Sequence, residues 1–372
     1  MEYLFILGRN IELSIAEIIN FLENNYLNFK IIDKIKNALL ISIGEDEKLK
    51  EDTIKKLGGT IFIGEVLASG NDKEIITKLN SMFLYYGKEN KLNYSLFNFE
   101  CPFYEKISFY LKKRFKEENL KASEKKLGKI LNLQNEEMVF LPSSKNQGNY
   151  FLFKDNFGKI IQNCDYDEIE KRDMKKPFRR PELSISPRLA KIMINLAKVK
   201  ENQRILDPFC GVGNILQEAL LQKIRVVGVD INPDAIRFAR QNLSYFNFDR
   251  RNYLLIKKDS SKLKINNIDA IITEPQLGEL QKKVPNKEES KKIIKDFENL
   301  VIKVFSHLSY KVKGRIVFTS PLIINKNEKI RCNFKFIEEK TNLNLVEGFP
   351  IEEFREDSYI GRDIVVLEKK NK

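Results

Sequence analysis

A chain of 372 residues, of which 42% are hydrophobic, is long enough for two or three domains that each bury a core. No segment approaches the roughly 20 consecutive apolar residues of a membrane span, and the acidic Glu2 stands where a signal peptide would be basic, so we expect a cytoplasmic protein without a membrane partner. The formal charge of +13 favours a polyanionic partner, most simply a nucleic acid, although a proteome rich in Lys, Asn and Ile also produces basic proteins.

The first 70 residues follow the order βαββαβ, which is the pattern of a ferredoxin-like domain. Ser14 and Glu17 have the spacing of a capping box, which predicts that the first helix begins there. The predicted elements are a strand at 3–7, a helix at 14–25, strands at 29–35 and 38–44, a charged helix at 46–58 and a strand at 60–68. By itself this fold says little about function.

A second α/β module is predicted for residues 71–165, with a basic amphipathic helix at 103–120. That helix and the segment after it carry a dense set of basic residues, namely Lys112, Lys113, Arg114, Lys116, Lys121, Lys125 and Lys126. A solvated helix face is the simpler interpretation of such a run. The aromatic residues that lie among them, Phe109, Tyr110 and Phe115, favour an RNA-facing surface instead.

Residues 166–187 are polar, basic and punctuated by prolines, which predicts a linker. This segment extends the predicted RNA-binding set by Arg172, Arg179 and Arg180. Residues 188–372 then alternate between strands, predicted at 204–207, 224–230, 253–259, 268–273, 314–321 and 364–369, and helices, predicted at 214–222, 233–245 and 288–310. Repeated βα units with apolar strands predict a parallel, doubly wound, Rossmann-like sheet.

The carboxyl ends of these strands carry acidic and small residues. Asp207 ends the first strand, and Gly211 and Gly213 after it let the backbone turn tightly, so that the amides of the next helix face a ligand. Asp230 ends the second strand, where a carboxylate can bind both hydroxyls of a ribose. The predicted cofactor-binding set is Asp207, Phe209, Gly211, Gly213, Asp230, Ile231, Asp259 and Ser260, in which Asp259 is placed to accept from an adenine amino group and Phe209 fits either the core or a wall of the base site.

A nicotinamide dinucleotide also uses glycines after the first strand and an acid after the second. Here Asn214 and Gln217 follow in place of the further glycine, and Asp207 would repel a pyrophosphate. S-adenosylmethionine is cationic and free of phosphate, so it suits Asp207 better, and simple capping by these acids is the alternative. The cysteines form no Cys-x-x-Cys pair and His307 is the only histidine, so no metal site is expected.

The sequence resembles the THUMP-domain tRNA guanosine-N2 methyltransferases nearly from end to end. The most specific similarity lies in residues 186–219, which include Asp207-Pro208-Phe209-Cys210-Gly211-Val212-Gly213. Residues 4–10 and the segment from Tyr166 to Asp173 are also similar to that family.

The resemblance implies three parts: a ferredoxin-like domain at 1–70, a THUMP RNA-binding domain at 71–165 and, after the linker, a class I methyltransferase domain at 188–372. It also implies that the THUMP half binds tRNA and that a methyl group passes from S-adenosylmethionine to N2 of a guanosine, typically at the tenth tRNA position.

The family carries Asp-Pro-Pro-Tyr-Gly where residues 274–278 read Glu-Pro-Gln-Leu-Gly. Because the lone pair of a base amino group is delocalised into the ring, such a site holds the NH2 with two acceptors while an aromatic side chain stacks on the base. Glu274 retains the side-chain acceptor and Pro275 its carbonyl, whereas Leu277 cannot stack, a loss of about 1–3 kcal/mol. The predicted catalytic residues are Glu274, Pro275, Gln276 and Leu277.

Three functions remain open on the sequence. The first is methylation of N2 of a tRNA guanosine. The second is a tRNA-binding homologue that no longer turns over, which Gln276 and Leu277 motivate. The third is methylation of another amino nitrogen, in ribosomal RNA or DNA, and the need for a small activating subunit is left open.

Overall fold

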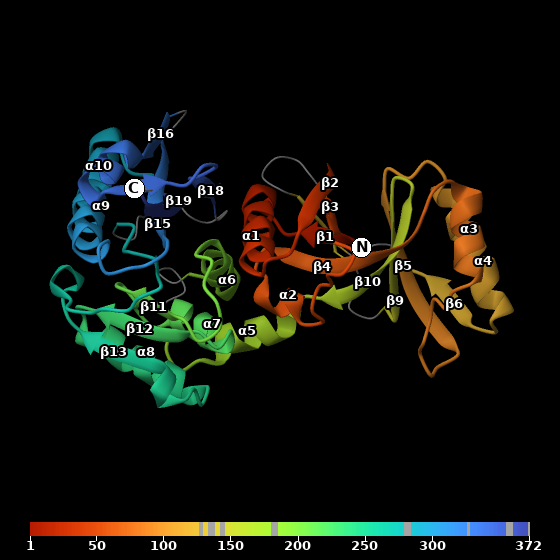
Figure 1. The fold of residues 1–372 in the computed structure, drawn as a ribbon, viewed down its shortest axis with the longest axis horizontal. Coiled ribbons are helices and arrows are strands. Elements are labelled where there is room, and N and C mark those ends of the chain that lie inside the picture. Colours follow the sequence, from red (N-terminus) through yellow and green to blue (C-terminus); the bar gives the residue numbers. More distant parts are fainter. Residues whose placement is uncertain are drawn as a thin grey trace. The chain divides into compact units, whose positions relative to one another are not determined.

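The computed structural model describes residues 1–125, 129–132, 138–141, 146–179, 185–278, 284–325, 328–354 and 360–370. The chain divides into two compact units (Figure 1). The first contains residues 1–15 and 25–165, and the second contains residues 16–24 and 166–372, so the division passes through the first helix.

The first unit is built on one sheet of eight strands in the order β2-β3-β1-β4-β10-β9-β5-β6. Strands β7 and β8 form a separate antiparallel pair. The elements in this part of the chain are β1 (Glu2–Leu7), α1 (Ile11–Asn24), β2 (Phe29–Ile35), β3 (Ala38–Ile43), α2 (Thr53–Lys56), β4 (Thr60–Ser69), α3 (Asp72–Asn80), β5 (Lys91–Phe99), α4 (Tyr104–Glu117), β6 (Lys121–Glu124), β7 (Lys129–Asn132), β8 (Met138–Leu141), β9 (Gly148–Phe153) and β10 (Asn156–Asn163).

The ferredoxin-like arrangement predicted for the first strands is confirmed. Strands β2, β3, β1 and β4 are neighbours in that order, each antiparallel to the next. The predicted capping box is wrong, because α1 begins three residues earlier and the side chain of Asn10 accepts a hydrogen bond from the Leu13 amide at 3.1 Å. The helix predicted at 46–58 is also shorter, with α2 limited to four residues.

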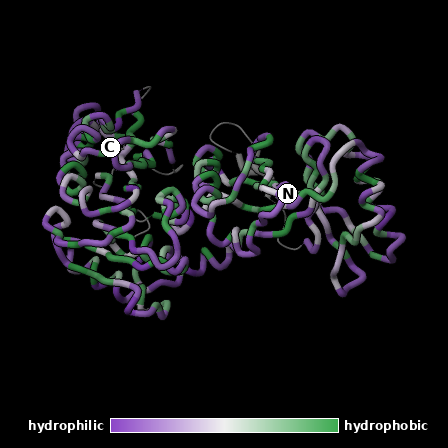
Figure 2. The backbone as a smooth tube through the Cα atoms, viewed as in Figure 1, coloured by the Kyte–Doolittle hydropathy of each residue, from purple (hydrophilic) through white to green (hydrophobic). Residues whose placement is uncertain are grey.

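The sheet continues across the predicted boundary at residue 70. Strand β10 pairs antiparallel with β4, so residues on both sides of that boundary share one sheet, and the boundary itself stays a prediction. The hydrophobic residues of this unit concentrate along its strands, as Figure 2 shows. Tyr94, Phe115 and Tyr150 are fully buried there.

The second unit carries a sheet with the main order β13-β12-β11-β14-β15-β19-β17. Its elements are α5 (Tyr166–Lys175), α6 (Pro187–Leu196), β11 (Arg204–Asp207), α7 (Asn214–Leu221), β12 (Arg225–Asp230), α8 (Pro233–Tyr245), β13 (Tyr253–Lys257), β14 (Ala270–Thr273), α9 (Lys287–Leu308), β15 (Ile316–Asn325), β16 (Glu328–Arg331), α10 (Phe334–Thr341), β17 (Leu343–Leu345), β18 (Ile351–Glu353) and β19 (Ile360–Lys369).

The strands from β13 to β15 are parallel, and β19 runs antiparallel to β15. Helices cover both faces of this sheet. A side chain at Gly228 would approach Leu216 of α7 to 2.5 Å, whereas the neighbouring Val227 and Val229 lie in the core cluster that contains Phe297 and Val301 of α9. Because successive strand residues face opposite sides, α7 and α9 lie on opposite faces. The predicted doubly wound α/β fold is therefore confirmed.

The segment predicted as a linker is partly ordered into α5, and the second unit includes it. None of the described helices combines the length and apolar character that crossing a membrane requires.

Candidate active site

The candidate site lies where the strand order of the second sheet reverses. Strand β11 has β12 on one side and β14 on the other, so the chain leaves β11 in one direction and later returns beyond it in the other. At such a switch point the loops after adjacent strands diverge and leave room for a ligand at the carboxyl edge. Asp207, Asp230 and Thr273 are the last residues of β11, β12 and β14, so their side chains meet at this edge.

Asp207 is buried, and one of its oxygens is fixed by two donors. Its Oδ1 accepts a hydrogen bond from Thr273 Oγ1 at 2.6 Å and one from the Phe209 amide at 3.1 Å. Burial is the main cause that raises the pKa of Asp207 to about 7; the two hydrogen bonds act against it, and the nearby carboxylates of Asp230 and Glu274 add to it. The site therefore holds a carboxyl group that changes its charge near neutral pH.

The glycine loop after β11 connects to Asp230. The Gly211 amide donates to Asp230 Oδ2 at 3.0 Å, and the Asn232 amide donates to Oδ1 at 2.8 Å. Gly211 has a φ of +52°, and a side chain there would meet nothing within 4 Å, so open space lies in front of the loop. Ile231 is 69% exposed beside it, which leaves an apolar surface free for the face of a base.

Gly213, which directly precedes α7, has a φ of +90°, a backbone conformation that favours glycine over residues with a side chain. Two other predicted cofactor residues are occupied within the protein. The Ser260 hydroxyl is buried and donates to the Pro208 carbonyl at 2.6 Å, and Asp259 Oδ1 accepts from the amide and hydroxyl of Ser261. Phe209 packs against the core and stays partly exposed.

Glu274 follows β14 directly and forms an ion pair that the sequence did not reveal. Nε of Arg362 on β19 donates to Glu274 Oε1 at 2.6 Å, and the two side chains are 6% and 9% exposed respectively. Thr273 donates to Asp207, and its neighbour Glu274 pairs with Arg362. These contacts connect the end of β11 to the beginning of β19.

The remaining residues of the predicted catalytic motif take different positions. Pro275 is buried, Gln276 is exposed with its amide donating to the Gly278 carbonyl at 3.4 Å, and Leu277 packs against the core cluster. Gly278 has a φ of +123°, and a side chain there would lie 3.2 Å from Ile293 of α9. Gly278 thus lies close to α9, and Leu277 packs against the core at the position where the resembling family has a stacking ring.

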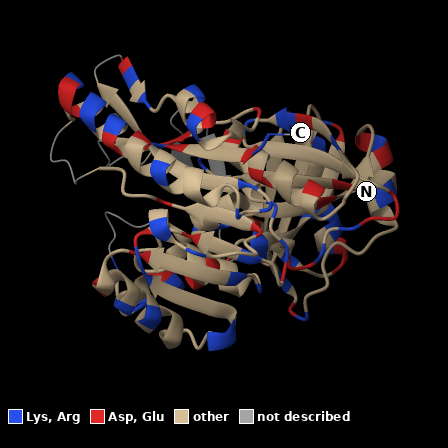
Figure 3. Ribbon diagram, turned by 60° about the vertical axis from the view of Figure 1, so that its left-hand side comes forward, with Lys and Arg blue, Asp and Glu red and all other residues tan. Residues whose placement is uncertain are grey.

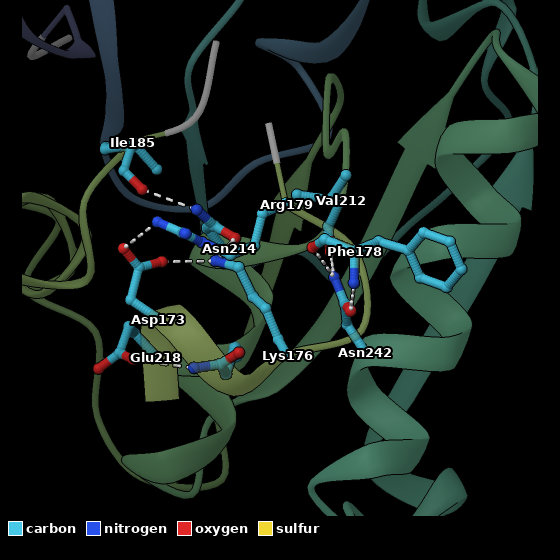
Figure 4. Close-up of polar contacts among 10 residues, drawn as sticks. Asp173, Lys176, Phe178, Arg179, Ile185, Val212, Asn214, Glu218 and Asn242 are labelled. Atoms are coloured by element: carbon cyan, nitrogen blue, oxygen red, sulfur yellow. Dashed lines mark hydrogen bonds and ion pairs between the residues drawn. The ribbon is translucent and has the colours of Figure 1, made fainter. Parts of the chain in front are cut away.

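A network of polar side chains ties the segment after α5 to the beginning of α7 (Figure 4). The Lys176 ammonium is buried and donates to Asp173 at 2.7 Å and to Asn214 Oδ1 at 2.8 Å. Asn214 in turn donates to the Ile185 carbonyl at 2.7 Å. Arg172 bridges to the buried Glu218 at 3.2 Å. The polar, proline-punctuated composition of this segment predicts a linker, and the network of contacts was not predictable from that composition.

Asn242 of α8 connects the same segment to the glycine loop. Its side chain accepts from the Phe178 amide at 3.0 Å and donates to the carbonyls of Phe178 and Val212 at 3.0 and 2.9 Å (Figure 4). A buried asparagine inside an amphipathic helix was the available signal. Through Val212 it fixes the loop that contains Gly211.

The predicted RNA-binding residues divide by exposure. Lys112, Lys113, Lys116, Lys121 and Lys125 are exposed, although Lys112 pairs with Glu124 at 3.0 Å and Lys113 with Glu117 at 3.7 Å. Basic and acidic residues are interspersed over the ribbons in Figure 3. The side chains of Arg114 and Arg172 are only 13% exposed and form internal ion pairs, and Arg179 pairs with Asp173 at 3.6 Å, so their binding to RNA stays a prediction. Lys126 and Arg180 lie outside the described residues.

The described residues fit S-adenosylmethionine. Two carboxylates, Asp207 and Asp230, stand at an edge where a pyrophosphate would be repelled and a cation attracted. Asp230 accepts one hydrogen bond at each oxygen, so lone pairs remain for the ribose hydroxyls. The open space before Gly211 and the exposed Ile231 leave room for the rest of the ligand.

Known proteins share both the sequence and the fold. A family model described as RMKL-like, methyltransferase domain, matches residues 176–322, and a model described as DNA methylase matches residues 9–241. The tRNA (guanine(10)-N2)-dimethyltransferase of Methanothermobacter thermautotrophicus is 44% identical over 108 residues, which are 29% of this chain and 31% of the relative. The enzyme of the same name from Methanocaldococcus jannaschii is 30% identical over 165 residues, 42% of this chain and 47% of the relative.

The matched segments therefore span from about a third to about half of the length of these curated relatives. The crystal structure of TrmN from Thermus thermophilus matches all of this chain and all of its own, with 13% identity and a TM-score of 0.50, which is a similarity of fold. The chain belongs to the family whose model, described as DNA methylase, matches residues 9–241, and parts of its sequence are similar to the tRNA (guanine(10)-N2)-dimethyltransferases.

Proposed function

We propose that the protein transfers a methyl group from S-adenosylmethionine to the exocyclic N2 of a guanosine in tRNA. The observation that carries this proposal is the position of Glu274 and Pro275 at the end of β14, beside the acidic edge formed by Asp207 and Asp230. A hydrogen-bond acceptor for an amine and a site for a cationic methyl donor thus occur at one sheet edge. The names of the relatives support tRNA as the substrate.

S-adenosylmethionine supplies an electrophilic methyl carbon, so that the guanine nitrogen forms the new N–C bond while the C–S electron pair goes to sulfur and one N–H proton is released. Glu274 and the Pro275 carbonyl would accept hydrogen bonds from the amine and turn its lone pair out of the ring plane. Asp230 would hold the ribose of the donor, and Asp207 its amino group. Because Leu277 has no aromatic ring, the base would have an apolar contact at this position and no stacking interaction.

We further propose that the first unit supplies tRNA affinity through the exposed lysines of α4 and the segment after it. Reversal of charge at Lys113 and Lys116 should weaken tRNA binding and reduce its salt dependence, because fewer counterions are released. Binding of S-adenosylmethionine should not change. Equal tRNA affinity in the variant and the wild type across salt concentrations would contradict this part of the proposal.

The test of the reaction is methylation of tRNA by the purified full chain, with the product nucleoside identified by mass spectrometry. Glu274→Gln is the informative variant, since an alanine would leave the buried Arg362 without any partner. We expect turnover to fall by about a hundredfold or more, while the Kd values for S-adenosylmethionine and tRNA stay within about twofold, because the interaction acts chiefly on the reacting amine.

A tRNA-binding protein without turnover is the second candidate, which the core packing of Leu277 favours. It would bind both ligands and transfer no methyl group. The assay is therefore run with and without a small activating subunit from the source organism. Binding of both ligands without transfer in either case would establish this second candidate and overturn the first.

A further inference from the structure

We propose that Arg362 is the positioning residue that fixes Glu274 for the amine of the substrate, an inference that rests on the proposed function. Its guanidinium and the Glu274 carboxylate form the ion pair at the carboxyl edge of the sheet, 2.6 Å between Nε and Oε1. In this role Arg362 acts through Glu274 and does not touch the reacting atoms.

The ion pair leaves one carboxylate oxygen for a substrate. Oε1 of Glu274 is taken by Arg362, whereas Oε2 accepts no hydrogen bond from any residue that the structure describes. A carboxylate oxygen has lone pairs for more than one donor. Oε2 is therefore the atom that would receive an N–H of the base, and Arg362 determines where it points.

Arg362 also restricts the additional side-chain freedom that the extra methylene group gives Glu274. A glutamate side chain has one more rotatable bond than an aspartate, so without a second contact its carboxylate would sample several positions. The ion pair from β19 supplies the missing constraint on the longer acid.

The pair also lies in a largely buried position. A carboxylate that is 9% exposed loses most of its hydration, and the hydrogen bond from the adjacent guanidinium offsets that loss. Without Arg362 the Glu274 side chain would lose the contact that orients it.

The experiment compares Arg362→Gln and Arg362→Lys with the wild type by kcat, by KM for tRNA, and by binding of tRNA and S-adenosylmethionine. For Arg362→Gln we expect kcat to fall by about a hundredfold, the size of effect that a displacement of about 1 Å produces. KM for tRNA and both Kd values should stay within about twofold. Arg362→Lys, which keeps the charge, should recover part of kcat.

Arg331 provides a matched control. It lies on β16, forms ion pairs with Glu352 and with the buried Asp363 at 3.3 Å, and has no contact with Glu274 among the described residues. Arg331→Gln should lower thermal stability in a similar way and leave kcat unchanged. If Arg362→Gln does not fold, the same comparison is made with Arg362→Lys, whose smaller loss of kcat is judged against Arg331→Lys.

The outcomes separate this inference from the proposed function. Wild-type transfer together with an unchanged kcat in Arg362→Gln would overturn the role of Arg362 and leave the methyltransferase in place. A parallel loss in Arg331→Gln would do the same, because it would show a general effect of stability. Absence of transfer by the wild type would overturn both. Strong non-additivity in the double variant Glu274→Gln, Arg362→Gln would support the inference.

Discussion

Replacement of Asp207 by asparagine should remove a large part of the pH dependence of folding. The substitution keeps the shape of the side chain and an Oδ1 acceptor for Thr273 and the Phe209 amide, and it removes the ionisable proton. In the folded protein burial raises the pKa of Asp207 from 3.8 to about 7. The folded state thus binds this proton more tightly than the unfolded chain.

The sign and the magnitude follow from this difference. The stabilising contribution is fully present below pH 3.8, falls as the pH rises, and is lost above about 7. At about 1.4 kcal/mol for each pH unit, a difference from 3.8 to about 7 corresponds to up to about 4 kcal/mol in the free energy of unfolding. Asp207→Asn should therefore gain stability relative to the wild type as the pH rises from 4 to 8 by up to about that amount.

Denaturant unfolding of both proteins at several pH values measures this difference. Asp363 is the control, since burial also raises its pKa to about 7 although its carboxylate lies near Arg331 and not at the predicted cofactor edge. Asp363→Asn should change the pH dependence of folding in the same direction and leave the Kd for S-adenosylmethionine unchanged. A free-energy difference between Asp207→Asn and the wild type that stays constant from pH 4 to 8 would refute the reasoning.

Two further predictions concern the glycine loop and its support. Gly211→Ala should weaken S-adenosylmethionine binding more than it lowers stability, because the new methyl group would point into open space at a left-handed residue. Gly228→Ala should instead lower stability more than it weakens binding, because its methyl group would meet Leu216 at 2.5 Å. Calorimetry and thermal denaturation of both variants test this contrast. Asn242→Leu should lower the free energy of unfolding by about 1–3 kcal/mol, because it removes the hydrogen bonds to Phe178 and Val212. An unchanged Kd for S-adenosylmethionine in that variant would contradict the idea that Asn242 holds the glycine loop in place through Val212.

The sequence predicted the parts of the fold that depend on local patterns. Apolar strands that end in Asp207, Asp230 and Thr273 alternate with amphipathic helices, and this order is enough to predict a doubly wound sheet with acids at one edge. Element boundaries were less accurate where side-chain bonds decide them. Asn10 caps α1 in place of Ser14, whose hydroxyl instead donates to the carbonyls of Asn10 and Gly59.

The segment 166–187 shows why a polar composition is a poor guide to its role. Its charges suggested a linker with an RNA-binding surface, but Arg172 and Lys176 pair with Glu218 and Asn214 of α7. These partners lie 46 and 38 residues away in sequence and are brought into reach only by the packing of α7. A cation that meets a buried acid in the fold cannot be distinguished from a solvated one by composition alone.

Arg362 was out of reach of the sequence for a more specific reason. Two charged residues, Arg362 and Asp363, stand together near the beginning of β19, and successive strand residues face opposite sides of a sheet. A shift of one residue in the pairing of β19 with β15 would turn Asp363 towards the face of Glu274 and Arg362 away from it. The observed register, with Arg362 opposite Pro321, therefore decides whether Glu274 meets a cation or a second carboxylate. Since β19 runs antiparallel, its beginning reaches the carboxyl edge where β14 ends, and only the assembled sheet brings the arginine to the acid.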